Sequence, residues 1–188
     1  MEIDDYYFSF DGRYLRKESN EQEERIIVID GNDNSNIIIH FADPIHDPES
    51  INSNTRLIVH TYETISSILE DSGATDPNNH GLIKGSLFLK NHSDSSKNDG
   101  ALDFVVSQSI IFKENALYIT QTDKDGYIAH NKYNYGNFLW GAAAKALGVP
   151  QSIAKLGAHV NNFFDRHYLG KLDSKDDQFS ISVGYNWK

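Results

Sequence analysis

The first two thirds of the chain show the apolar pattern of short strands broken by turn residues. Residues 6–10 and 13–16 flank Asp11-Gly12, a dipeptide typical of type I′ turns, which predicts a β-hairpin. Apolar residues at i, i+3 and i+4 predict one short helix over residues 63–71. Runs rich in β-branched and other apolar residues predict further strands over residues 25–30, 36–42, 56–60, 82–90, 101–108 and 116–121.

Beyond residue 130 the apolar period becomes that of helices. Residues 134–147 predict a helix that Gly148 ends, and Pro150 favours a second helix over residues 151–164. Gly141 and Gly157 lie inside these helices, where glycine costs about 1 kcal/mol relative to alanine. Each is therefore expected to permit close approach of another helix or of a ligand. Residues 176–184 are ambiguous, because part of this segment alternates like a strand.

The order of these elements predicts an α+β fold. An antiparallel β-sheet region over residues 1–125 would be followed by a helical region over residues 126–188, within a single compact domain. The chain has 188 residues and no cysteine, which excludes disulfides, thiolate metal sites and a cysteine nucleophile. We expect neither a metal nor another cofactor.

Charge and hydropathy narrow the possible partners. The formal net charge is −10, which argues against a protein that coats nucleic acid and leaves nucleic acid possible only as a substrate. The charge is uneven, with a net of −13 over residues 1–125 and +3 over residues 126–188. No stretch approaches the roughly 20 apolar residues that span a bilayer, so stable membrane insertion is not expected. The acidic start lacks a signal-peptide pattern, so export would need a carrier.

Polar and aromatic residues are densest between residues 129 and 141. On a helix, Asn134, Asn137 and Gly141 share one face, which favours a concave face that contacts substrate, with Tyr135 and Trp140 alongside. The alternative is an N-terminal cap, by Asn131 or Asn134, plus one buried amide.

Two histidines are candidates for general acid–base chemistry, because imidazole titrates near neutral pH. His130 opens the Asn-rich segment, and His159 shares a helix face with Asn162. A histidine on a helix is more often structural, and that alternative stays open.

Two acidic segments complete the candidates. Asp173, Asp176 and Asp177, followed by Gln178, can raise one carboxyl pKa, bind a hard cation or cap a helix. Asp43, His46 and Asp47 form a weaker group, which we interpret as a pair of Asx turns rather than a metal site.

The motif segments resemble a known family. Residues 134–142 resemble the Gly-Asn-aromatic-x-(Tyr/Trp)-Gly-Ala core of the polymorphic toxin type 44 domain. Residues 157–161 are similar to its Ala-Gly helix, and residues 173–184 to its closing Asp-Asp-x-x-Asp-Gln motif. Residues 6–52 resemble the lead-in of related toxin regions in Bacteroidetes Rhs and type VI secretion proteins. The resemblance implies an antibacterial effector domain, released from a larger secretion carrier, delivered into target bacteria and neutralised by a cognate immunity protein.

Three functions fit these observations. The first is a hydrolase that attacks peptidoglycan or its precursor in the periplasm, since an aromatic, Asn-rich cleft suits sugars and glycan hydrolysis uses paired carboxylates. The second is a metal-independent ribonuclease with two histidines, and the third is a non-enzymatic interaction module. For an enzyme, the predicted catalytic residues are His130, His159, Asp173, Asp176 and Asp177. The predicted substrate-binding residues are Asn134, Tyr135, Asn137, Trp140, Asn162 and Gln178.

Overall fold

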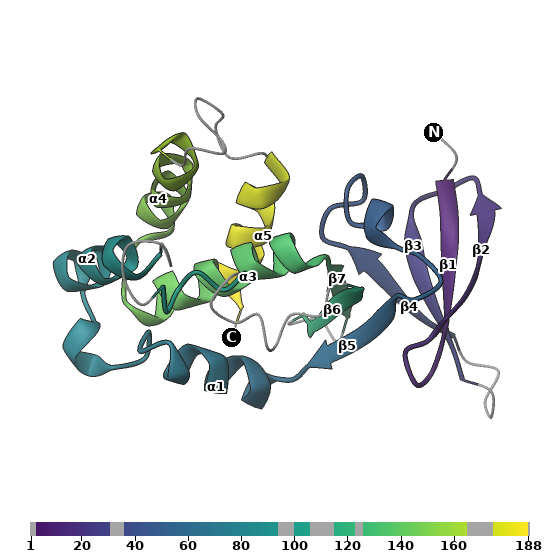
Figure 1. Ribbon diagram of the computed structural model, residues 1–188, viewed down its shortest axis with the longest axis horizontal. Helices are drawn as coiled ribbons and strands as arrows, with labels where there is room; N and C mark the ends of the chain where they lie inside the picture. Colours follow the sequence, from purple (N-terminus) through teal and green to yellow (C-terminus); the bar gives the residue numbers. More distant parts are fainter. Residues whose placement is uncertain are drawn as a thin grey trace. The chain divides into compact units, whose positions relative to one another are not determined.

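The computed structural model describes residues 3–30, 36–93, 100–105, 115–122, 126–164 and 175–187, with backbone alone for residues 158–164 and 175–176. The chain divides into two units (Figure 1). The strand unit comprises Met1–Tyr62 and Lys113–Asn134, and the helical unit comprises Glu63–Phe112 and Tyr135–Lys188.

One seven-stranded sheet builds the strand unit. Its spatial order is β2-β1-β3-β4-β7-β6-β5. The pairs β1–β3, β4–β7 and β5–β6 are parallel, and the pairs β1–β2, β3–β4 and β6–β7 are antiparallel. The strands are β1 (Ile3–Ser9), β2 (Tyr14–Asn20), β3 (Arg25–Ile29), β4 (Asn36–Phe41), β5 (Arg56–His60), β6 (Ala116–Gln121) and β7 (Tyr127–His130).

The α+β class is confirmed, but the sheet is mixed where an antiparallel one was expected. Parallel neighbours require a crossover between them. Strand β2 lies between β1 and β3 in the sequence, although β1 and β3 are neighbours in the sheet. The first part of the helical unit lies between β5 and β6 in the sequence. These crossovers depend on distant pairing, which the local pattern does not record.

The two edges of the sheet meet, so the sheet is curled. The Leu57 amide of β5 donates to the Gly12 carbonyl at 2.9 Å, and Arg13 forms an antiparallel bridge with Arg56. Gly12 has φ +79°, and a Cβ at this position would lie 2.7 Å from the Leu57 carbonyl oxygen. The Asp11-Gly12 turn therefore forms the predicted hairpin and also closes the sheet against β5.

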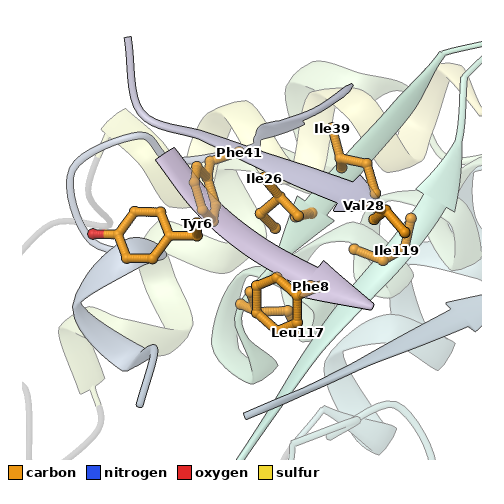
Figure 2. Close-up of a cluster of buried hydrophobic side chains, with 9 residues drawn as sticks. Tyr6, Phe8, Ile26, Val28, Ile39, Phe41, Leu117 and Ile119 are labelled. Carbon is orange, nitrogen blue, oxygen red and sulfur yellow. The ribbon is translucent and has the colours of Figure 1, made fainter. Parts of the chain in front are cut away.

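Alternate positions along the strands fill the core of this unit. Figure 2 shows their side chains gathered between the strands, with the Tyr6 ring edge-on to Phe41 at 5.9 Å between centroids. Successive strand residues point to opposite faces, so residues two apart share the inner one. The buried cluster consists of Tyr6, Phe8, Ile26, Val28, Ile39, Phe41, Leu117, Ile119 and Ala129.

The described residues also form five α-helices, which lie largely in the helical unit. In the view of Figure 1, α3 runs between α1 below it and α4 and α5 above it. Phe138, Leu139 and the alanines at 142, 143 and 144 are buried, as expected of a helix that is apolar on most sides. The helices are α1 (Tyr62–Asp71), α2 (Leu82–His92), α3 (Lys132–Ala146), α4 (Gln151–Phe164) and α5 (Lys175–Asn186).

Two expected strands are not strands. The segment 82–90 lies in α2, where Gly85 and Leu89 are buried one helical turn apart. Residues 101–105 form turns, and residues 106–108 lie outside the described residues. The ambiguous segment 176–184 belongs to α5. In α2 and α5, positions three or four apart pack on neighbouring parts of the helical unit, and these tertiary contacts override the local alternation.

Two glycines allow α3 and α5 to cross at backbone distance. A Cβ on Gly141 would overlap the backbone oxygen of Ile181, and a Cβ on Gly184 would overlap that of Phe138. Gly141 therefore serves the approach of another helix, one of its two predicted roles. Gly157 differs, since its added Cβ would lie in ordinary contact, 3.6 Å from Trp140 Cζ2.

We expect Gly141→Ala to lower the free energy of unfolding by about 1 to 3 kcal/mol, because the methyl group has no room at the crossing. Gly157→Ala is the matched control, and we expect it to raise stability by up to about 1 kcal/mol through helix propensity. Urea unfolding followed by circular dichroism measures both. Equal effects of the two substitutions would contradict the crossing.

Candidate functional site

A compact polar group lies in the strand unit, in the segment that follows β4. Asp43 accepts hydrogen bonds on Oδ1 from the backbone amides of Ile45 (2.9 Å) and His46 (3.1 Å), which is the predicted Asx turn. Its Oδ2 lies 2.7 Å from Nδ1 of His46. The Asp43 side chain is 2% exposed, whereas that of His46 is 55% exposed. A buried carboxylate therefore holds one edge of a solvent-accessible imidazole.

Asp47 ties this segment to the start of α3. Its side chain is fully buried, and Oδ2 accepts from the backbone amide of Asp43 at 2.9 Å. Its Oδ1 accepts from the backbone amide of Asn131 and from Nδ2 of Asn134, both at 2.9 Å. Asn131 in turn caps α3, because its Oδ1 accepts from the amides of Tyr133 and Asn134.

Burial dominates the electrostatics of Asp47. Desolvation raises its pKa to about 6, and the nearby negative charge of Asp43 acts in the same direction. The hydrogen bonds from Asn131, Asp43 and Asn134 oppose the rise, because they stabilise the charged carboxylate.

Of the two predicted Asx turns, the one at Asp43 is confirmed, whereas the Asp47 carboxylate bonds instead to Asp43, Asn131 and Asn134. The spacing Asp43-x-x-His46 is visible, yet it does not distinguish a turn from a carboxylate–imidazole pair. The bond between Asp47 and Asn134 joins residues 87 positions apart, so no local signal could have found it. Among the described residues, no three histidine or acidic side chains lie close enough together to hold a metal ion.

His130, a predicted catalytic residue, lies in the core. Its side chain is fully buried, and its Nε2 lies 3.1 Å from the Thr120 hydroxyl. Desolvation lowers its pKa to about 3, so the imidazole is neutral near pH 7. This placement offers a substrate no direct access to the ring, and it suits a structural role.

The asparagines near the start of α3 follow the cap-and-buried-amide alternative. Asn131 is the cap, and Asn134, predicted to bind substrate, is buried against Asp47. Tyr135, also predicted to bind substrate, is fully buried and stacks on Phe138 at 5.7 Å between centroids. Neither side chain is accessible to a substrate at the surface, because both are buried in the core.

In the helical unit one pair of predicted site residues meets, and two others bond to the backbone of α4. Asn137 donates from Nδ2 to Oδ1 of Asp177 at 2.7 Å, linking α3 to α5. Trp140 donates from Nε1 to the Ala154 carbonyl at 3.2 Å, and Gln178 donates from Nε2 to the Lys155 carbonyl at 3.4 Å. The α3 face that carries Asn137 and Gly141 is therefore covered by α5 rather than open as a concave surface.

The remaining predicted residues lie outside the described side chains. They are His159, Asn162 and Asp176, of which the structure describes the backbone, and Asp173.

Comparisons of this chain with family models, with curated proteins and with solved structures returned no match. Within the described residues, no helix combines the length and apolar character needed to cross a bilayer.

We expect the buried neutral His130 to make stability fall as the pH drops. Its folded pKa lies below the unfolded value of about 6.5, so its contribution is present above pH 6.5 and is lost as the pH falls toward 3. Between pH 7 and pH 5 this component amounts to about 2 kcal/mol. Urea unfolding at both pH values should show a correspondingly smaller loss in His130→Gln than in the unmodified protein.

Asp47 provides the internal control for that experiment. Its folded pKa is raised above 3.8, so its contribution is present below pH 3.8 and is lost as the pH rises through about 6. The effect is common to both proteins and cancels in their difference. An identical pH dependence in the two proteins would show that His130 titrates normally. We also expect His130→Ala to reduce stability, because it leaves a cavity in the core.

Proposed function

We propose that this chain is a hydrolytic effector domain that acts on the bacterial cell envelope, with His46 as its general base and Asp43 as the positioning residue. One observation carries the proposal: the exposed imidazole of His46 has its Nδ1 2.7 Å from a carboxylate that is almost completely buried. A buried acid beside an accessible histidine is the arrangement by which many hydrolases orient a base.

The chemistry follows from the two ring nitrogens. With the Nδ1 proton donated to Asp43, Nε2 carries the lone pair and can take a proton from water. The water oxygen then bonds to the carbonyl carbon of an amide or ester. As the bond to the leaving group breaks, the imidazolium returns the proton to that group. Asp43 holds the required tautomer and stabilises the imidazolium while it exists.

Asp47 supports this geometry from behind. Its Oδ2 accepts from the Asp43 amide, and its Oδ1 is anchored by Asn131 and Asn134. The turn is therefore fixed at both ends, so that little rearrangement is needed when substrate binds.

Charge supports an envelope target over RNA. The strand unit, which contains His46, has 16 acidic and 8 basic residues, a net charge of −8. A polyanion is repelled by such a surface, whereas the peptide part of peptidoglycan carries amide bonds without a phosphate backbone.

The hydrogen-bond partners of Asp43 and Asp47 favour an amide or ester, rather than a glycosidic bond, as the bond that is hydrolysed. Glycoside hydrolysis normally uses two carboxyl groups that flank the scissile bond. Among the described acids near His46, Asp43 is engaged by the imidazole and Asp47 by three donors.

The effector role is supported by the resemblance to the polymorphic toxin type 44 domain. The contact between Asn137 and Asp177 joins its first and last motif segments, which lie 40 positions apart. A cognate immunity protein and a larger carrier remain part of the proposal on that ground.

We expect His46→Ala to abolish killing when the domain is expressed with a periplasmic signal in a sensitive bacterium. On purified sacculi, release of new amino groups should fall roughly 100-fold or more, the usual contribution of a general base. His40→Ala is the matched control, since His40 is an exposed histidine 3.5 Å from Glu23 and should keep full activity. Asp43→Asn should also lower the rate of amino-group release, because an amide does not hold the Nδ1-protonated tautomer of His46 as the carboxylate does.

Other outcomes would favour the alternatives. Killing only from the cytoplasm, with loss of RNA, would replace the envelope target with the ribonuclease. New reducing ends instead of amino groups would mean that the scissile bond is glycosidic. Full killing by His46→Ala would rule out the proposed base.

A further inference from the structure

Two carboxyl groups from neighbouring segments meet at the start of β1. Parallel pairing places Asp5 of β1 beside Arg25 of β3. Asp4 and Glu24, one residue earlier in each segment, are therefore neighbours as well. Because successive residues of a strand point to opposite faces, the two pairs lie on opposite faces of the sheet. Asp5 and Arg25 form an ion pair at 2.7 Å. The other pair brings two acids together on the inner face, which also carries Tyr6.

The hydrogen-bond partners of these two carboxyl groups differ. Asp4 is buried, and its carboxylate accepts from Nζ of Lys17 at 2.7 Å and from the Ser19 hydroxyl at 3.2 Å. Oε2 of Glu24 is shielded from solvent and accepts no hydrogen bond from the described residues. A buried acceptor without a donor is destabilising. A proton on Oε2 removes that cost, because the oxygen becomes a donor and the carboxylate of Asp4 is the neighbouring acceptor.

Electrostatics at this position act in the same direction. Burial raises the pKa of Glu24, and the negative charge of Asp4 raises it further. The Asp4 amide, the Tyr6 hydroxyl and the charge of Lys17 oppose this rise without cancelling it. Figure 2 shows the Tyr6 hydroxyl pointing away from the apolar cluster. The pKa of Tyr6 is raised by burial and by the charges of Glu24 and Asp4, and Tyr14 is the remaining titratable group that acts on it.

We propose that Glu24 and Asp4 share one proton, and that loss of this proton releases the end of the segment 20–24 from β1. With the proton in place, the segment that connects β2 to β3 is held against β1 at its last residue. Without the proton, two negative charges face each other on the inner face, and the Glu24 side chain turns outward to water. The first residue stays bound in both states, because Asn20 donates from Nδ2 to Oδ1 of Asp5 at 2.9 Å.

The direction of the pH effect follows from the shift at Glu24. Its folded pKa lies above the ordinary value of 4.5, so its contribution to stability is fully present below pH 4.5 and is lost as the pH rises through the raised pKa. The segment 20–24 is therefore held at low pH and released at higher pH. This switch requires neither His46 nor any hydrolytic activity, so it does not depend on the proposed function.

A carbon-13 NMR titration of the side-chain carboxyl groups tests the shared proton. We expect the midpoint of Glu24 to lie above pH 4.5, and the Asp4 resonance to move at that same midpoint, because the two groups titrate as a pair. Asp4→Asn should shift the Glu24 midpoint to lower pH, since it removes the facing negative charge. A Glu24 midpoint at or below pH 4.5, or one that Asp4→Asn leaves unchanged, would overturn the proposal.

The heteronuclear NOE of the backbone amides of Gln22, Glu23 and Glu24 measures the release, because it falls when a segment moves on the picosecond to nanosecond timescale. We expect it to fall as the pH rises through the Glu24 midpoint. Glu24→Gln keeps a neutral donor at this position, so the segment should retain its low-pH values at every pH. Glu21→Gln, which changes an exposed acid of the same segment, is the matched control and should show the decrease of the unmodified protein. A constant NOE across the midpoint in the unmodified protein would rule out the release.

Discussion

The carboxylate of Asp47 is the constraint around which the strand unit is organised. A buried charged group must find its hydrogen-bond partners within the protein, because water does not reach it. Asp47 takes the Asp43 amide from its own segment and the Asn131 amide and Asn134 side chain from the start of α3. The end of β4 and the N-terminus of α3 are thereby held at a fixed separation. The parallel pairing of β4 with β7 brings the same two parts of the chain together.

The accessible histidine depends on that constraint. His46 stands between two acids with different tasks: Asp43 faces its imidazole, and Asp47 fixes the backbone on which Asp43 is carried. The rise in the pKa of Asp47 to about 6 shows how strongly burial opposes its charge. A buried carboxylate of this kind opposes stability, so it is expected where it fixes the position of other groups. Asp47 fixes the backbone of Asp43, and Asp43 faces the imidazole of His46.

What the sequence could predict was local. The Asp11-Gly12 hairpin, the strands at 56–60 and 116–121 and the helix at 151–164 were predicted correctly, because each depends on neighbouring residues. The parallel pairings and α2 were not, since crossovers and helix packing involve distant contacts. The same division applies to the site. Asn137 and Gly141 were expected to face a ligand, and only the position of α5 shows that they face Asp177 and Ile181. His130 looked catalytic because composition does not reveal burial.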